Sequence, residues 1–370
     1  MTVRAAAALA AAMGIGRFVY TPILPLMTAQ AGLSATSAAG LATANYLGYF
    51  VGALITVVRA PSRLVNRVAL VLLVATLAGM PLTHGMVAWF VLRLVAGVAS
   101  ALVFVAAVNA RPGWGMSGVG VGIALSGLLV LEWGQWQAAW WAAAGAAAVL
   151  AAGAWGLEPK PPKVSDLPER IGVGARRPLG AGESGSIQST HRSRPAFAVL
   201  FTAYTLEGVG YIIAATFLVA AISGPLGSSA WILVGVSAAL SPIVIRPHRR
   251  ALPAALAVQA VGIALPALVD GSALIATVLF GGTFIGIAAT ALNQGAGFPN
   301  GPAILTAGYS AGQIIGPLVA TPLLHNGYDH ALLLAAGIVT VAAVTALAPP
   351  SRRRPGARTR KRSPRAAPAE

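Results

Sequence analysis

The sequence predicts an all-α polytopic membrane protein with twelve spans, arranged as two pseudo-symmetric six-helix bundles. Hydrophobic residues make up 57% of the 370-residue chain and charged residues only 9%, compared with about 25% charged in a typical soluble domain. Apolar runs long enough to cross a bilayer, about 20 residues each, recur along the whole chain. Short glycine-containing motifs of the first half return in the second half in the same order. These observations exclude a single soluble globular core.

Twelve apolar runs can be delimited, and each is predicted to form one membrane-spanning helix. The first run begins after Arg4 and continues to Met27, so it is predicted to be an uncleaved span and not a signal peptide. The eighth run is the least regular, because it is short and contains Pro242. The predicted spans are residues 5–28, 35–58, 68–84, 86–108, 115–133, 136–156, 196–222, 229–246, 251–269, 272–292, 303–324 and 330–349.

The basic residues lie in alternate connections between these spans. Arg59, Arg63 and Arg67 follow the second span, and most other basic residues lie in 157–195 and 350–370. Because basic loops remain in the cytoplasm, both termini are predicted to be cytoplasmic, with the protein in the inner (plasma) membrane. The net charge of +16 is therefore attributed to topology, and no nucleic-acid partner is expected.

The spans and the polar segments divide the chain into four parts. Residues 1–156 are predicted to form the first six-helix bundle and residues 196–349 the second. Residues 157–195 are rich in Pro, Gly, Ser and Arg, and are predicted to form a disordered cytoplasmic linker. Residues 350–370 are predicted to form a basic cytoplasmic tail.

An internal repeat relates the two halves in parallel order. The motif at 14–18 in the first span resembles the motif at 208–212 in the seventh, and the glycines at 118–122 in the fifth span resemble those at 308–312 in the eleventh. Transporters built from two such halves hold their site between the halves, near the midplane of the bilayer.

Several blocks of the sequence resemble the major facilitator superfamily, and more narrowly its uncharacterised YbfB/YjiJ branch. The most specific block is Gly14-Ile-Gly-Arg-Phe-Val-Tyr-Thr-Pro-Ile-Leu-Pro-Leu-Met27. In the fourth span, Arg93-Leu-Val-Ala-Gly97 matches the Arg-x-x-x-Gly motif of the superfamily. The remaining blocks are Asn45–Tyr49, Gly118–Gly127, Gly210–Ile213 and Gly312–Pro317.

The resemblance implies the major facilitator fold and transport by alternating access, but it names no substrate. In related transporters the arginine of the fourth span serves proton coupling, which implies that role for Arg93; a packing role is the alternative. The loop after the second span runs from Leu54 to Arg63 without the acidic residue that helps to latch the two halves in the superfamily.

Two ionisable side chains lie inside predicted spans and are the main site candidates. Arg17 is in the middle of the first span, where a charge costs about 2.5–3.5 kcal/mol on insertion scales. We expect it to bind an anionic or carbonyl group, as a planar fork that matches carboxylate. Glu207 in the seventh span is the candidate proton carrier, because burial disfavours its charged form. The alternative for both is structural: Arg17 pairs with a carbonyl group or with Glu207.

Polar side chains on the cavity-forming spans are predicted to line a shared, water-filled cavity with Arg17. Asn45 and Tyr49 are four residues apart and share a helix face. Hydrogen bonding between helices is the alternative for each of these side chains. The predicted substrate-binding set is Arg17, Tyr20, Asn45, Tyr49, Tyr211 and Gln313, and the predicted proton-coupling residues are Glu207 and Arg93.

These candidates predict a secondary active transporter of a small organic solute, driven by protons in a lipid bilayer. An organic anion is one candidate for this solute. The chain contains no cysteine, no phosphate-binding Gly-x-x-x-x-Gly-Lys loop and no catalytic constellation, so enzyme activity, a metal site and a cofactor are not expected. The predicted state is a monomer. The alternative function is a membrane sensor or scaffold that signals through the basic linker and tail without transport.

Overall fold

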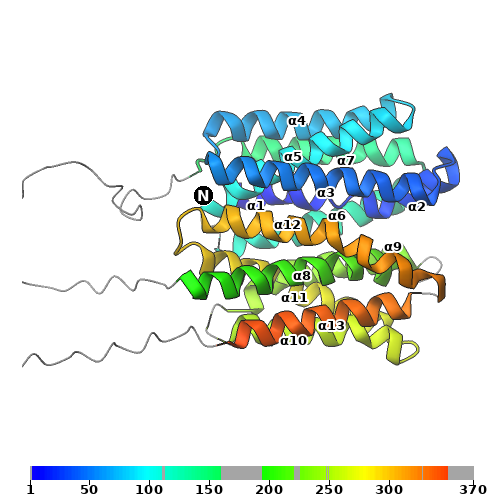
Figure 1. Ribbon diagram of the computed structural model, residues 1–370. Helices are drawn as coiled ribbons and strands as arrows, with labels where there is room; N and C mark the ends of the chain where they lie inside the picture. Colours follow the sequence, from blue (N-terminus) through cyan, green and yellow to red (C-terminus); the bar gives the residue numbers. More distant parts are fainter. Residues whose placement is uncertain are drawn as a thin grey trace, which may run out of the picture.

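The computed structural model describes residues 2–110, 113–159, 194–220, 226–246, 248, 250–326 and 328–348. Within these ranges the regular structure is helical, and the helices form two bundles that lie side by side (Figure 1). The predicted all-α fold with two bundles is confirmed. The predicted tail and nearly all of the predicted linker lie outside the described residues.

Within each bundle the helices follow one another along the chain with short connections. The first bundle contains α1 (Thr2–Leu9), η1 (Ala10–Ile15), α2 (Tyr20–Ala31), α3 (Ala35–Val58), α4 (Arg63–Leu82), α5 (Met86–Asn109), η2 (Gly113–Met116), α6 (Ser117–Trp133) and α7 (Trp136–Ala154). The second bundle contains α8 (Arg194–Ala220), α9 (Leu226–Val244), α10 (Ala251–Leu268), α11 (Ala273–Gly295), α12 (Gly301–Ala320), η4 (Thr321–Asn326) and α13 (Asp329–Leu347).

The helices match the predicted spans. Eleven helices of the described chain are long and apolar enough to cross a membrane, and the shorter apolar helix Ser229–Val244 corresponds to the predicted eighth span. The first span, Thr2–Ala31, has 30 residues and is not one regular helix. It consists of α1, the π-helical η1 and α2.

The internal repeat corresponds to an equivalent helix crossing in each bundle. A Cβ atom added to Gly14 would lie 2.4 Å from the Cα atom of Gly122, where the first span crosses α6. A Cβ atom added to Gly312 would lie 2.5 Å from the carbonyl oxygen of Thr205, where α12 crosses α8. Both crossings bring backbones together, which only small residues allow. The glycines therefore recur because both bundles need the same close approach.

The two bundles meet mainly through α6 with α9 and through α3 with α12. At Gly120 an added Cβ atom would lie 2.1 Å from the backbone nitrogen of Ala239, so α6 and α9 are in backbone contact. The Nδ2 atom of Asn300, at the start of α12, donates a 3.1 Å hydrogen bond to the carbonyl oxygen of Val57 near the end of α3. These contacts lie on the side of the bundles for which the sequence predicts a cytoplasmic location.

Arginines of the first bundle hold the end of α7. Arg4 donates to the carbonyl oxygen of Gly156 (3.1 Å), and Arg67 donates to that of Trp155 (3.2 Å). Arg63 forms a 3.1 Å ion pair with Glu158. Cations are favourable at a helix C-terminus, where carbonyl groups lack helical partners. Arg63, at the start of α4, thus has its acidic partner in Glu158, just beyond the end of α7.

Candidate functional site

The first span is broken in its middle, next to Arg17. The amide nitrogens of Gly16 and Phe18 bond five residues back, to the carbonyl oxygens of Ala11 (2.8 Å) and Met13 (3.2 Å), in place of the usual four. A π-helical segment of this kind interrupts the regular helix and often marks a functional position. The amide of Thr21 then bonds to Phe18 and leaves the carbonyl oxygen of Arg17 without its helical partner.

Arg93 of α5 supplies the missing partners of this break. Its Nη1 atom donates to the carbonyl oxygen of Gly16 (3.3 Å), and its Nη2 atom donates to that of Arg17 (3.1 Å). The guanidinium also lies 4.9 Å from the ring centroid of Tyr20. The side-chain Nδ2 atom of Asn45 donates in turn to the main-chain carbonyl oxygen of Arg93 (3.1 Å). These contacts give Arg93 a positioning role, and its predicted part in proton coupling stays a prediction.

Arg17 lies at the boundary between the bundles, and its side chain is 3% exposed. Its guanidinium carbon is 4.0 Å from the ring centroid of Tyr49 and 5.4 Å from that of Tyr46, both on α3. Its Nη2 atom donates across the boundary to the Oε1 atom of Gln313 on α12. Its Nε and Nη1 atoms are buried and make no hydrogen bond of good geometry among the described residues, although Tyr49 lies near the guanidinium. Unpaired buried donors of a charged group are costly, so this site lacks an acceptor.

Glu207 on α8 is 1% exposed and is held by neutral side chains. Its Oε1 atom accepts a 3.2 Å hydrogen bond from the Nε2 atom of Gln259 on α10. Tyr309 on α12 also lies near this carboxyl group, although its hydroxyl makes no hydrogen bond of good geometry. Arg17 and Glu207 form no ion pair in the part of the chain that the structure describes. Direct pairing of the two, one of the alternatives from the sequence, therefore does not occur in this structure.

Tyrosines and one face of α12 connect the two ionisable groups. Tyr309 stacks on Tyr204, with 4.6 Å between ring centroids, and lies 5.9 Å from Tyr211. Tyr211 and Tyr309 are each within electrostatic range of both Arg17 and Glu207. Tyr309 and Gln313 are four residues apart and share a helix face, so the same face of α12 meets Glu207 and Arg17.

The predicted site residues all lie in the protein interior, and each has an identifiable setting. The Tyr20 hydroxyl donates to the carbonyl oxygen of Ala38 (3.0 Å). Tyr211 stacks on Phe284, with 4.2 Å between ring centroids. Side-chain exposure does not exceed 4% for any of Tyr20, Asn45, Tyr49, Tyr211 and Gln313.

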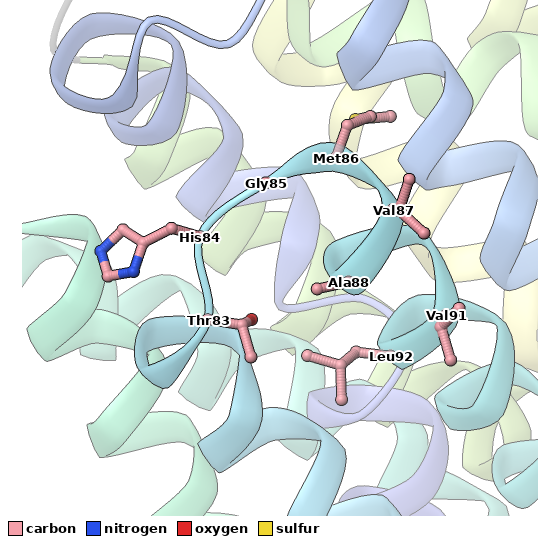
Figure 2. Close-up of a pocket in the computed structure, with 8 residues that line it drawn as sticks. All are labelled: Thr83, His84, Gly85, Met86, Val87, Ala88, Val91 and Leu92. Carbon is pink, nitrogen blue, oxygen red and sulfur yellow. The ribbon is translucent and has the colours of Figure 1, made fainter.

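The expected water-filled cavity around Arg17 and Glu207 is a point on which the structure differs from the sequence prediction. Both side chains are enclosed by protein, at 3% and 1% exposure, so solvent does not reach them in this conformation. An open hollow of about 620 Å³ lies elsewhere, at the connection between α4 and α5 (Figure 2). Its lining includes Thr83, Met86 and Leu92, and the His84 ring points away from these side chains. This hollow contains no residue of the candidate site.

Sequence reasoning missed two polar partners and an aromatic group. Gln259 and Tyr309 meet Glu207, and Phe280 and Phe284 on α11 stack with Tyr211. A signal was present for the first two: Gln259 is a polar side chain inside an apolar span, and Tyr309 lies within the repeated glycine motif. Phe280 and Phe284 are apolar residues in an apolar helix, so nothing in the sequence distinguished them.

Comparisons with known proteins agree with this architecture. The family model described as "Uncharacterised MFS-type transporter YbfB" matches residues 9–347. The crystal structure of the human organic anion transporter MFSD10 (TETRAN) is similar in fold, with a TM-score of 0.65 over 93% of this chain and 99% of that chain, at 16% sequence identity. A search of curated proteins finds no match. Since the family model covers most of the chain, the protein belongs to the YbfB-like family of major facilitator superfamily membrane transporters.

Proposed function

We propose that the protein is a proton-coupled secondary transporter of a small organic anion, which binds at Arg17 between the two bundles. The observation that carries this proposal is the guanidinium of Arg17, which is buried at the bundle boundary with two of its three nitrogens unpaired. A carboxylate supplies the missing acceptors and matches the guanidinium in shape and charge. An ionisable side chain inside a membrane span is a functional-site hypothesis by default.

The contrast between the two arginines explains why Arg17 and not Arg93 is proposed to bind the anion. Arg93 directs two nitrogens at backbone carbonyl oxygens of its own bundle. Arg17 donates a hydrogen bond across the boundary, to Gln313 of the opposite bundle. A movement of the bundles therefore breaks the contact of Arg17 and leaves those of Arg93 intact.

Glu207 is proposed to carry the coupled proton. Its carboxyl group is buried beside the amide of Gln259 and the phenol of Tyr309, with no cation paired to it in the described chain. Neutral partners of this kind can accommodate either protonation state by reorienting their hydrogen bonds. The shared face of α12, with Tyr309 at Glu207 and Gln313 at Arg17, supports a link between proton and anion.

Alternating access follows from the enclosed position of both groups. The ligand can reach Arg17 only when the bundles part, and opposite openings on the two membrane faces would release it on either side. We propose that the protein lies in the inner membrane with both termini on the cytoplasmic side, as the sequence predicts. The Asn300–Val57 bond would then belong to the cytoplasmic closure.

Flux in proteoliposomes tests the proposal. The full-length protein is reconstituted, and the exchange of radiolabelled acetate, succinate, benzoate and cyclohexanecarboxylate is compared with that of protein-free vesicles. We expect at least one anion to exchange, Arg17→Ala to abolish this exchange, and Glu207→Gln to exchange without responding to a pH gradient. Wild-type flux and wild-type pH response in both variants would refute the assigned roles.

A further inference from the structure

Aromatic rings extend from Arg17 across the boundary between the bundles. Phe18, the next residue, belongs to the first bundle and meets two rings of the second bundle edge-on. Its centroid is 6.4 Å from that of Trp231 on α9, at 65°, and 6.1 Å from that of Phe284 on α11, at 81°. The indole nitrogen of Trp231 donates a 3.2 Å hydrogen bond to the Ser126 hydroxyl of the first bundle, which fixes the plane of the indole.

Behind these contacts the second bundle holds three nearly parallel rings. Tyr211 is stacked on Phe284, with centroids 4.2 Å apart and planes 13° apart. Phe280 lies 5.6 Å from Tyr211 with its plane at 9°. Phe280 and Phe284 are four residues apart on α11 and their planes differ by 5°. The parallel arrangement of these three rings involves only side chains of α8 and α11 and does not depend on Phe18.

The opening of the bundles would break the contacts that cross the boundary and keep those within the second bundle. The edge contacts of Phe18 and the Trp231–Ser126 hydrogen bond cross the boundary and must break, whereas the parallel rings lie within the second bundle and can remain. The surface that becomes accessible then combines flat aromatic faces with the guanidinium of Arg17. A flat ligand gains aromatic contact on that surface beyond simple burial, and an anionic group on the ligand replaces Gln313 as the partner of Arg17.

We infer that the ligand of this site is a planar aromatic monocarboxylate, a choice of substrate class that rests on the proposed function. Its carboxylate binds Arg17, and its ring lies among Phe18, Trp231 and Phe284. One negative charge is expected because the second arginine, Arg93, is already engaged with two carbonyl oxygens. A second carboxylate would be buried without a partner, which is strongly unfavourable.

Four probes of similar size separate shape from charge: benzoate, cyclohexanecarboxylate, benzamide and phthalate. Binding to the purified full-length protein in nanodiscs is measured by isothermal titration calorimetry. We expect benzoate to bind most tightly and cyclohexanecarboxylate, which has the same charge but no flat face, to bind roughly threefold to tenfold more weakly. Benzamide and phthalate, with no charge and two charges, are each expected to bind at least about tenfold more weakly than benzoate.

Two variants and a matched control assign the preference to residues. Phe284→Leu keeps an apolar side chain but removes the ring, and it is expected to reduce the ratio of the cyclohexanecarboxylate Kd to the benzoate Kd toward one. Arg17→Gln is expected to remove the binding of both anions. Phe90→Leu changes a partly exposed phenylalanine on α5 and is expected to leave both affinities unchanged. The probe series on the unaltered protein gives the answer even where a variant fails to fold.

The outcomes distinguish this inference from the function on which it rests. Equal affinity for benzoate and cyclohexanecarboxylate, with both lost in Arg17→Gln, overturns the aromatic class and leaves an anion transporter. Equal affinity for benzamide and benzoate overturns the anion site itself. Binding of none of the four probes, or an unchanged benzoate preference in a folded Phe284→Leu protein, also overturns the aromatic class.

Discussion

The Nη2 atom of Arg93 donates a 3.1 Å hydrogen bond to the main-chain carbonyl oxygen of Arg17. The neighbouring carbonyl oxygen of Gly16 accepts from Nη1 of the same guanidinium. One buried arginine thus holds the backbone of the other at the point where the first span is broken. The side chain of Arg17 is left to face the second bundle, and the account of the site depends on this division of roles.

Replacement of Arg93 tests the positioning role. Lysine keeps the charge but lacks the rigid fork that reaches two carbonyl groups. Arg93→Lys should therefore lose at least one of the hydrogen bonds to the carbonyl oxygens of Gly16 and Arg17. Loss of a hydrogen bond to a charged group costs about 1.5–3 kcal/mol, so anion affinity should fall by roughly 10-fold to 100-fold. The pH dependence of the remaining flux should match that of the unaltered protein. A changed pH dependence with unchanged affinity would instead assign Arg93 to proton coupling.

Gln313 should compete with the ligand for Arg17. Gln313→Glu places a carboxylate in the position of the amide oxygen that Arg17 already binds, and an internal ion pair should then exclude an external anion. We expect at least about a tenfold loss of anion affinity together with a raised melting temperature. The control is Gln135→Glu, at an exposed connection before α7, where affinity should not change. Normal anion binding by the Gln313→Glu protein would contradict the assigned contact.

Glu207→Gln should separate transport from the pH gradient. The amide has nearly the size of the carboxyl group and can still bond to Gln259, but it cannot take up a proton. Counterflow between equal pH values should continue, while the acceleration or slowing caused by a pH gradient should disappear. Glu132→Gln, at an exposed position of α6, is the matched control and should keep the gradient response. A gradient response that persists in Glu207→Gln would remove this residue from the coupling mechanism.

The bundle contact at Gly120 should not tolerate a methyl group. An added Cβ atom there would lie 2.1 Å from the backbone of Ala239 on the opposite bundle, whereas one on Gly145 of α7 would meet nothing within 4 Å. Gly120→Ala should therefore lower the melting temperature and disfavour the closed conformation. Gly145→Ala should be neutral or stabilise by up to about 1 kcal/mol, because alanine is the better helix former. Equal melting temperatures for the two variants would contradict the close approach of α6 and α9.

Much of the fold could be predicted from the sequence, because hydropathy and glycine spacing express it directly. The apolar runs gave the spans, including the irregular eighth, and the repeated glycines at Gly14 and Gly208 reflect a crossing that both bundles share. Pro22 and Pro25 are the sequence signal for the irregular first span, because proline lacks the backbone donor that a regular helix needs.

The contacts of the site were less predictable. Opposite charges on Arg17 and Glu207 suggested a pair, but each is bound by a glutamine from a distant helix, Gln313 and Gln259. The partners of Arg93 are backbone carbonyl groups, which every residue has and no sequence pattern marks. Hydropathy also does not report whether the bundles are parted or closed, so the expected water-filled cavity could not be distinguished from the enclosed site that the structure shows.

The exchange of an organic anion by reconstituted protein carrying Arg17→Gln tests anion binding at Arg17 most directly. The substitution removes the charge and the two unpaired donors of the site but keeps a polar side chain. We predict that exchange falls to the level of protein-free vesicles, while the melting temperature stays within a few degrees of that of the unaltered protein. Exchange at the unaltered rate by a folded Arg17→Gln protein would contradict anion binding at Arg17.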